Sequence, residues 1–189
     1  MTDGPCLPEP DQIVPETKDW TWVLERPCPD CGLDTPAVDP TRVAGMVRDN
    51  AQAWQRVLAD TTAVRSRPAP GVWSPLEYAC HVRDVFTLFD ERLALMLRGD
   101  DPLFANWDQD ETAVVEGYGE QDPAAVAAEL ERAAQVLAGS FAAVQGDQWD
   151  RPGRRSDGAH FTVGSFARYF IHDPVHHLWD VTGQRAPAV

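Results

Sequence analysis

The sequence predicts an all-α protein, a four-helix bundle that follows an irregular, Pro-rich N-terminal arm. Four long segments carry apolar residues mostly three and four positions apart, which is the spacing of an amphipathic helix. Three of these segments open with Asp-Pro or Ser-Pro, an N-cap residue followed by proline at the first helical position. Few segments alternate like strands, so helices packing on helices are the expected architecture. A length of 189 residues suits a single core.

The arm is predicted to span residues 1–39 and the bundle residues 40–185. Prolines fix φ and remove backbone donors, so we expect the arm to be extended and to lie over the bundle. It carries a Cys-x-x-Cys pair, Cys28 and Cys31. The alternation from Trp20 to Leu24 indicates either a short strand or an apolar anchor.

The first two helices have clear starts. The first follows Asp39-Pro40 and is expected to run to about residue 60. The second follows Ser74-Pro-Leu-Glu77, a capping box with proline at the first helical position. It is expected to end near Arg98, because Gly99 follows.

The second half of the chain supplies the other two helices. Residues 101–122 read as a loop with a short helix. A third helix is expected from Pro123 to about Val144, and a turn-rich connection from Arg151 to Gly158 leads to a last helix over residues 163–182.

The net charge of −14 argues against a nucleic-acid partner, because such binding depends on Lys and Arg neutralising phosphates. An anionic membrane surface is disfavoured for the same reason. No apolar run approaches the roughly 20 residues needed to cross a bilayer, and no basic-then-apolar leader opens the chain. We therefore expect a cytoplasmic protein.

The four cysteines are too few and too unevenly placed for a disulfide scaffold; they are Cys6, Cys28, Cys31 and Cys80. The Cys28/Cys31 pair allows three interpretations: half of a structural zinc site, a redox motif, or an unbridged pair. Zinc needs two further ligands, for which Cys6 and His160 are candidates if the arm folds back. Redox chemistry of this type belongs to an α/β setting that the sequence does not predict. Cys80 is expected in the core.

Histidines form the most informative pattern, since His172, His176 and His177 fall inside the last helix. Residues four apart on a helix lie about 40° apart in rotation, so His172 and His176 can face the same way. His81, in the second helix, can supply a third ligand. Three protein ligands and one open position are typical of catalytic zinc, and imidazole also suits nickel. His177 fits less well, because it is rotated about 140° from His172.

Other interpretations of these residues are open. A single histidine on an apolar helix face is often a hydrogen-bonded core residue. Pro174 either bends a continuous helix or opens a new one, and the second case would leave His172 outside the helix. Glu77 and Asp84 lie on the face of His81, and either can accept a hydrogen bond from an imidazole or act as an extra ligand. Asp84 is our first candidate for a general base, and Asp173 can play the hydrogen-bonding part on the last helix.

Two motifs together give a family resemblance. The segment from Trp73 to Asp84 resembles the WS-x-x-E-x-x-x-H-x-x-D segment of the DinB/YfiT-like superfamily, and the segment from His172 to His177 resembles its HD-x-x-HH segment. The resemblance implies a four-helix bundle with a divalent metal, often zinc or nickel, held by His81, His172 and His176 near the bundle end. It also implies frequent homodimers and relatives that use low-molecular-weight thiols such as mycothiol or bacillithiol.

We therefore predict a metal-dependent enzyme that activates a thiol or water for transfer or isomerisation on a small molecule, with hydrolysis as a further possibility. The alternative is a non-catalytic helical module that binds metal or contacts a basic protein. Aromatic and acidic residues between positions 104 and 111 are candidates for the mouth of a site, together with Trp73. The alternative, that the tryptophans pack in the core and the acids form a solvated loop, is slightly favoured.

Overall fold

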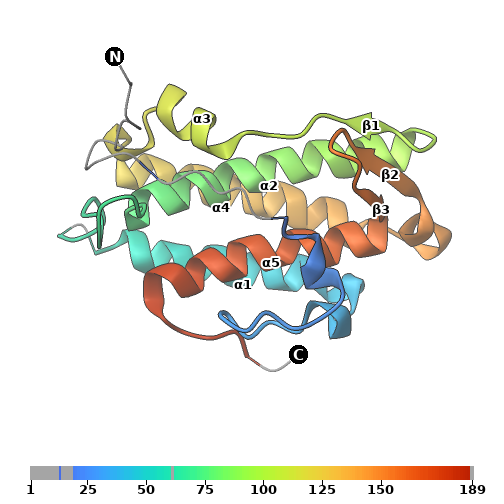
Figure 1. Ribbon diagram of the computed structural model, residues 1–189, viewed down its shortest axis with the longest axis horizontal. Helices are drawn as coiled ribbons and strands as arrows, with labels where there is room; N and C mark the ends of the chain where they lie inside the picture. Colours follow the sequence, from blue (N-terminus) through green and yellow to red (C-terminus); the bar gives the residue numbers. More distant parts are fainter. Residues whose placement is uncertain (1–12, 14–18, 61, 188–189) are drawn as a thin grey trace, which may run out of the picture.

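Four long helices form the body of the protein (Figure 1). The computed structural model describes residue 13, residues 19–60 and residues 62–187. The long helices are α1 Val43–Leu58, α2 Pro75–Arg98, α4 Pro123–Ala142 and α5 Val163–Thr182. Helix α4 packs on α1 and α2, and α5 packs on the same two helices from the other side, so the order around the bundle is α1, α4, α2, α5. The predicted four-helix bundle is confirmed.

The helix starts follow the caps that the sequence contains. Ser74 Oγ accepts from the backbone N–H of Glu77 at 3.3 Å, and Glu77 Oε2 accepts from the N–H of Ser74 at 2.8 Å. Asp122 caps α4 by accepting from the N–H of Ala125 at 2.9 Å. Asp39 instead caps a 3-10 helix, Pro40–Arg42, that leads into α1. Each cap satisfies backbone donors that the first turn leaves unpaired.

Aromatic rings fill the centre of the bundle. The ring of Phe170 on α5 lies with its centroid 5.0 Å from Phe89 and 6.0 Å from Phe86, both on α2, and 5.7 Å from Phe141 on α4. Trp54 of α1 is fully buried in the same core. Burial of these large rings supplies the main driving force for packing. Within the described ranges, no helix is both long and apolar enough to cross a bilayer.

The described part of the N-terminal segment lies along α5, seen in blue beside the red helix in Figure 1. It contains two 3-10 helices before Pro40, Thr21–Leu24 and Thr35–Ala37, so it is less extended than predicted. The strand alternative for Trp20 to Leu24 is wrong, whereas the apolar anchor is confirmed by the fully buried Val23. Residues 1–12 and 14–18 of the predicted arm, with Cys6, lie outside the described residues.

A small sheet and a short helix occupy the connections. Strands β1 Leu103–Phe104, β2 Pro152–Arg155 and β3 His160–Thr162 form a sheet in the order β1-β2-β3, parallel and then antiparallel. This sheet is not predictable from the sequence, because strands of two to four residues are too short to show an alternating pattern. Helix α3, Gln109–Val115, confirms the short helix expected between residues 101 and 122.

Candidate functional site

Helix α2 holds His81 in its second turn, fully buried between two tryptophans. The Trp107 ring stacks on the imidazole at a centroid distance of 5.4 Å and an interplanar angle of 9°, and the Trp73 ring lies 5.3 Å away. Trp107 is itself fixed, since its Nε1–H donates to Thr112 Oγ1 on α3 at 2.8 Å. The two indoles therefore set the plane of the imidazole and exclude water from it.

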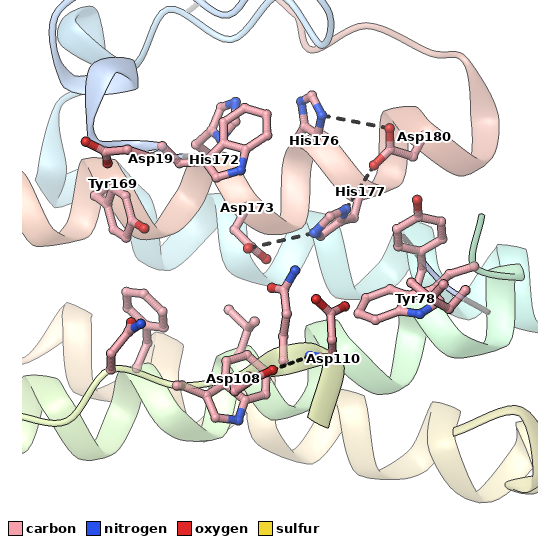
Figure 2. A pocket seen from close by; sticks show the side chains of 18 of the residues that line it. Asp19, Tyr78, Asp108, Asp110, Tyr169, His172, Asp173, His176, His177 and Asp180 are labelled. Carbon is pink, nitrogen blue, oxygen red and sulfur yellow. Dashed lines mark hydrogen bonds and ion pairs between the residues drawn. The ribbon is translucent and has the colours of Figure 1, made fainter. Parts of the chain in front are cut away.

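Helix α5 carries two pairs of polar residues four positions apart, and the pairs are offset by one residue. His172 and His176 form one pair, and Asp173 and His177 form the other. Successive residues on a helix differ by about 100° in rotation, so the two pairs point in different directions. Figure 2 shows His172 and His176 on one side of α5, and His177 on the side facing α2.

Pro174 lies inside α5 without ending it, so the continuous-helix alternative is confirmed. Asn50 of α1 donates from Nδ2 to the carbonyl oxygen of Pro174 at 2.8 Å, which ties this turn to the neighbouring helix.

His81, Asp173 and His177 form the first candidate metal group, here called the histidine–aspartate cluster. One ligand atom from each lies within 4.8 Å of the others. Asp173 Oδ1 is 3.3 Å from His81 Nε2, and Asp173 Oδ2 is 3.8 Å from His177 Nε2. Two ligands bound tetrahedrally at zinc distances lie about 3.4 Å apart, so only small shifts would bring all three onto one ion.

Asp173 has the electrostatics of an ionised ligand. Burial raises its pKa, but the facing rings of His81 and His177 outweigh burial and lower the pKa to about 2. Its Oδ1 is buried, and its contact with His81 Nε2 at 3.3 Å does not have hydrogen-bond geometry. A cation between the carboxylate and the imidazole would satisfy both groups.

His177 is oriented by a second carboxylate. Asp180 Oδ2 lies 2.9 Å from His177 Nδ1. A carboxylate accepts hydrogen bonds and does not donate them when ionised, so Nδ1 carries a proton, and Nε2 is the nitrogen left to bind a metal beside Asp173. Carboxylates of this kind commonly fix the tautomer of metal-binding histidines.

A cavity of about 730 Å³ opens beside the histidine–aspartate cluster. Asp173 and His177 form part of its wall, as do His172 and His176, while His81 lies behind the tryptophans. The residues expected at the mouth of the site all line it: Trp73, Trp107, Asp108 and Asp110. Trp73 is also almost fully buried and Trp107 packs against the core, so a role for these residues at the mouth of a functional site stays a prediction.

Cationic side chains also line this cavity, which the sequence analysis did not foresee. Arg92 is 5% exposed, and its guanidinium donates to the carbonyl oxygen of Ala105 at 2.7 Å. Arg92 Nε has no hydrogen-bond partner among the described residues. Burial lowers the pKa of Arg92 to about 10.

Cys28, Cys31, His172 and His176 form the second candidate group, here called the cysteine–histidine cluster. All four are buried, and one ligand atom from each lies within 4.8 Å of the others. Cys28 Sγ lies 3.6 Å from His176 Nδ1. Burial lowers the pKa of His176, which favours its neutral, metal-binding form.

The structure therefore separates the three histidines that we expected to share one ion. His81 lies with Asp173 and His177, whereas His172 and His176 lie with the two cysteines. The reason is the rotation of about 100° between the neighbouring pairs on α5, which turns His172 and His176 toward the N-terminal segment. Two features of the sequence could have indicated this separation. Asp173 and His177 are also four positions apart, and a zinc site at Cys28 and Cys31 needed two further ligands. Of the ligands considered for that pair, His160 lies exposed in β3.

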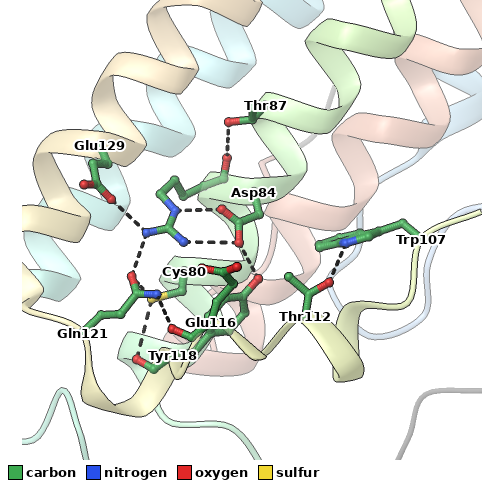
Figure 3. A network of polar contacts seen from close by, with 10 residues as sticks. Cys80, Asp84, Thr87, Trp107, Thr112, Glu116, Tyr118, Gln121 and Glu129 are labelled. Carbon is green, nitrogen blue, oxygen red and sulfur yellow. Dashed lines mark hydrogen bonds and ion pairs between the residues drawn. The ribbon is translucent and has the colours of Figure 1, made fainter. Parts of the chain in front are cut away.

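Asp84 belongs to neither cluster, although we expected it to act as a base or to partner His81. Its carboxylate accepts from Arg83 Nε at 2.8 Å and from the Tyr118 hydroxyl at 2.5 Å (Figure 3). Arg83 also donates to Glu129 of α4 at 2.9 Å. Three positions along a helix turn a side chain by about 60° from the starting direction, which is enough to face Asp84 toward other partners. Glu77 also belongs to neither cluster, because its carboxylate accepts from Arg67 and from the backbone N–H of Ser74 at the start of α2.

Comparisons with known proteins agree on the family and the fold. The model of the DinB superfamily matches residues 46–181 of the chain. The structure is similar to that of YfiT from Bacillus subtilis, with a TM-score of 0.71 and 14% identity over 76% of this chain and 84% of that one. YfiT is described as a probable metal-dependent hydrolase with an unusual four-helix bundle topology. No curated protein matches the chain in sequence at a significant level.

Proposed function

Because the chain belongs to the DinB superfamily, we propose that it is a metal-dependent enzyme acting on a small molecule. The histidine–aspartate cluster is the proposed centre. The observation that carries the proposal is the convergence of His81, Asp173 and His177, from two helices, on one point at the wall of a 730 Å³ cavity. The likeness of the fold to YfiT, described as a probable metal-dependent hydrolase, supports the same class of function.

The donor atoms suit a catalytic ion. Two imidazoles and one carboxylate form the ligand set of several catalytic zinc sites, and three protein ligands leave a further position for water or substrate. Imidazole and carboxylate donors also bind nickel and iron, so the residues fit more than one divalent metal. We propose zinc or nickel as the resident ion.

The protein's own residues prepare this position. Asp173 stays ionised because of the facing histidines, and Asp180 keeps Nε2 of His177 directed inward. Trp73 and Trp107 shield His81 from water, which strengthens electrostatic interactions at the cluster. A divalent ion in such a position lowers the pKa of a bound water or thiol and so supplies a nucleophile at neutral pH.

Metal analysis of purified variants tests this centre. We expect His177→Gln and Asp173→Asn each to lose one equivalent of bound metal relative to the wild type. His160→Gln is the matched control, because His160 is exposed in β3 and outside both clusters. Retention of the full wild-type metal content by both cluster variants would rule the centre out.

A second experiment distinguishes water from a low-molecular-weight thiol as the nucleophile. A panel of ester, amide and electrophilic substrates is assayed with and without an added thiol. Turnover only in the presence of thiol supports transfer chemistry, whereas thiol-independent turnover supports hydrolysis. Either activity should disappear in Asp173→Asn.

We propose in addition that the substrate carries an anionic group. Arg92 is almost fully buried at the cavity wall, and its Nε lacks a partner among the described residues. Guanidinium groups in such places commonly pair with a carboxylate or phosphate. Matched substrates with and without a carboxylate should differ in KM, and Arg92→Gln should abolish that difference. An unchanged preference in the variant would contradict this assignment.

A further inference from the structure

We propose that Cys28, Cys31, His172 and His176 bind a structural zinc ion that fastens the N-terminal segment to α5. This inference does not rest on the proposed function, since it concerns a different set of ligands on the other side of the helix. Two thiolates and two imidazoles form a complete tetrahedral set for zinc, with no position left for a substrate. The cysteine–histidine cluster is therefore of the structural type.

The spacing of the ligand atoms fits the ion. With zinc–sulfur bonds of about 2.3 Å and zinc–nitrogen bonds of about 2.0 Å, tetrahedral geometry separates sulfur and nitrogen by about 3.5 Å. Cys28 Sγ and His176 Nδ1 lie 3.6 Å apart. All four ligand atoms lie within 4.8 Å of one another, close enough to converge on a single ion.

The Cys28–Gly32 turn presents both sulfurs to the same side. The backbone N–H of Gly32 donates to the carbonyl oxygen of Cys28 at 3.0 Å, and the N–H of Cys28 donates to that of Leu33 at 3.0 Å. Gly32 has a φ of +81°, in the left-handed region that glycine tolerates best. A Cys-x-x-Cys-Gly turn of this kind is the usual way for a short segment to supply two zinc ligands.

The turn is also anchored from the other end of the chain. The N–H of Ala186 donates to the carbonyl oxygen of Cys31 at 2.8 Å, and Arg185 donates to that of Pro29 at 2.9 Å. The residues after α5 therefore hold the cysteine turn against the helix that carries the two histidines.

The four ligands are almost fully buried, and only His172 and His176 border the 730 Å³ cavity. The exposed fractions of the four residues are 1%, 0%, 3% and 8% in chain order. The Trp20 ring lies over both histidines, with centroid distances of 5.2 Å to His172 and 5.0 Å to His176. On the far edge of the His176 ring, Nε2 lies 3.8 Å from Asp180 Oδ1, longer than a hydrogen bond but near enough for the carboxylate to act on the imidazole electrostatically.

Zinc here would fix the rotation of α5. His172 and His176 precede Asp173 and His177 by one position each, so anchoring the first pair fixes the direction of the second. Asp180 joins the two clusters, since its oxygens face both His176 and His177. The structural ion would thereby keep Asp173 and His177 directed toward His81.

X-ray absorption at the zinc edge tests the site in the intact chain, purified after growth with added zinc. We expect sulfur scatterers at about 2.3 Å from zinc. In His177→Gln, where the other cluster is removed, zinc should fall to one equivalent with two sulfur and two nitrogen neighbours. If the proposed catalytic centre is wrong, the wild type itself will show that two-sulfur environment. Bound zinc without sulfur neighbours, or a Cys28–Cys31 disulfide without zinc, would overturn the proposal.

Cysteine variants provide the matched comparison. Cys31→Ser should lose the sulfur-bound zinc, and its cobalt-loaded form should lose the thiolate-to-cobalt charge-transfer absorption. Cys80→Ala should retain both, because Cys80 is a buried thiol of α2 outside the cluster. Equal zinc content and equal cobalt spectra in the two variants would also overturn the proposal. Circular dichroism verifies that both are folded.

Discussion

At the scale of single residues, Asp84 illustrates how a carboxylate next to a candidate ligand can serve structure instead of chemistry. It accepts from Arg83 and from Tyr118, and Tyr118 is only 1% exposed. Burial and the hydrogen bond to Asp84 both raise the pKa of Tyr118, so the phenol remains the donor. The pair joins the segment after α3 to α2.

Tyr118→Phe should therefore reduce stability without affecting bound metal. The variant loses a hydrogen bond to a charged acceptor, for which about 1.5 to 3 kcal/mol is the usual cost. Urea denaturation measures the loss, and metal analysis of the same sample should give the wild-type content. A drop in metal content would contradict the structural role and indicate that Asp84 supports the metal centre.

The candidate ligands could be found in the sequence as residue types but not fully as a set. His81, His172 and His176 were recognised from their spacing, and each lies in a candidate metal cluster. Which of them meet depended on a rotation of about 100° between neighbours, and so on which element packs on each side of α5. That is a property of tertiary packing, and a single helical pattern does not contain it.

At the scale of elements, the start of α2 concentrates several interactions on Glu77. Its carboxylate closes the capping box with Ser74 and pairs with Arg67, whose Nη2 lies 2.5 Å from Oε1. Burial raises the pKa of Glu77, but these partners outweigh burial and lower it below the ordinary value of 4.5. A lowered pKa means that the charged form stabilises the fold above pH 4.5, and that this contribution is lost as the pH falls below it.

Glu77→Gln should consequently cost about 1 to 3 kcal/mol at neutral pH, and the difference from the wild type should shrink as the pH falls below 4.5. Urea unfolding at a series of pH values measures the free energies. Glu91→Gln, at an exposed position of the same helix, serves as the control and should change little. A difference between Glu77→Gln and the wild type that stays constant down to acid pH would contradict the assignment.

The small sheet packs tightly on the end of α2. A Cβ atom added to Gly153 in β2 would lie 2.7 Å from Met96 Cγ and 2.9 Å from Met96 Cε, and Met96 is fully buried. Gly153→Ala should therefore destabilise the protein by about 1 to 3 kcal/mol, since the core has no room for the methyl group.

Gly139→Ala provides the opposite case within α4. Nothing lies within 4 Å of the added Cβ, so the change should stabilise the protein by about 0.5 to 1 kcal/mol. Thermal unfolding of both variants measures the two signs. A destabilised Gly139→Ala, or a neutral Gly153→Ala, would contradict the packing described here.

The helices were predictable because capping and periodicity are local. Ser74 and Asp122 are the N-caps of α2 and α4, as expected from their residue types and the prolines that follow them. The sheet was not predictable, because β1 and β2 pair across some 50 intervening residues and neither has a pattern of its own. The 3-10 helix Thr21–Leu24 resembled a strand for a related reason. Four residues are too few to distinguish the repeat of a helix from the alternation of a strand.

At the scale of the whole molecule, α5 is the element that the two candidate metal centres share. One pair of its side chains lies with the two cysteines and the other lies with His81. Figure 2 shows His177 on the side of α5 that faces α2, and His176 on another side. The helix is tied to α1 through Asn50 and to the core through Phe170. The bundle thus places two candidate metal centres back to back on one helix, and residues of both border the 730 Å³ cavity.

Anomalous diffraction from crystals of the zinc-loaded protein, collected on both sides of the zinc edge, tests this arrangement most directly. Two anomalous peaks are expected, one within bonding distance of Cys28, Cys31, His172 and His176, the other of His81, Asp173 and His177. A single peak bonded jointly to His81, His172 and His176, or no peak at either cluster, would contradict it.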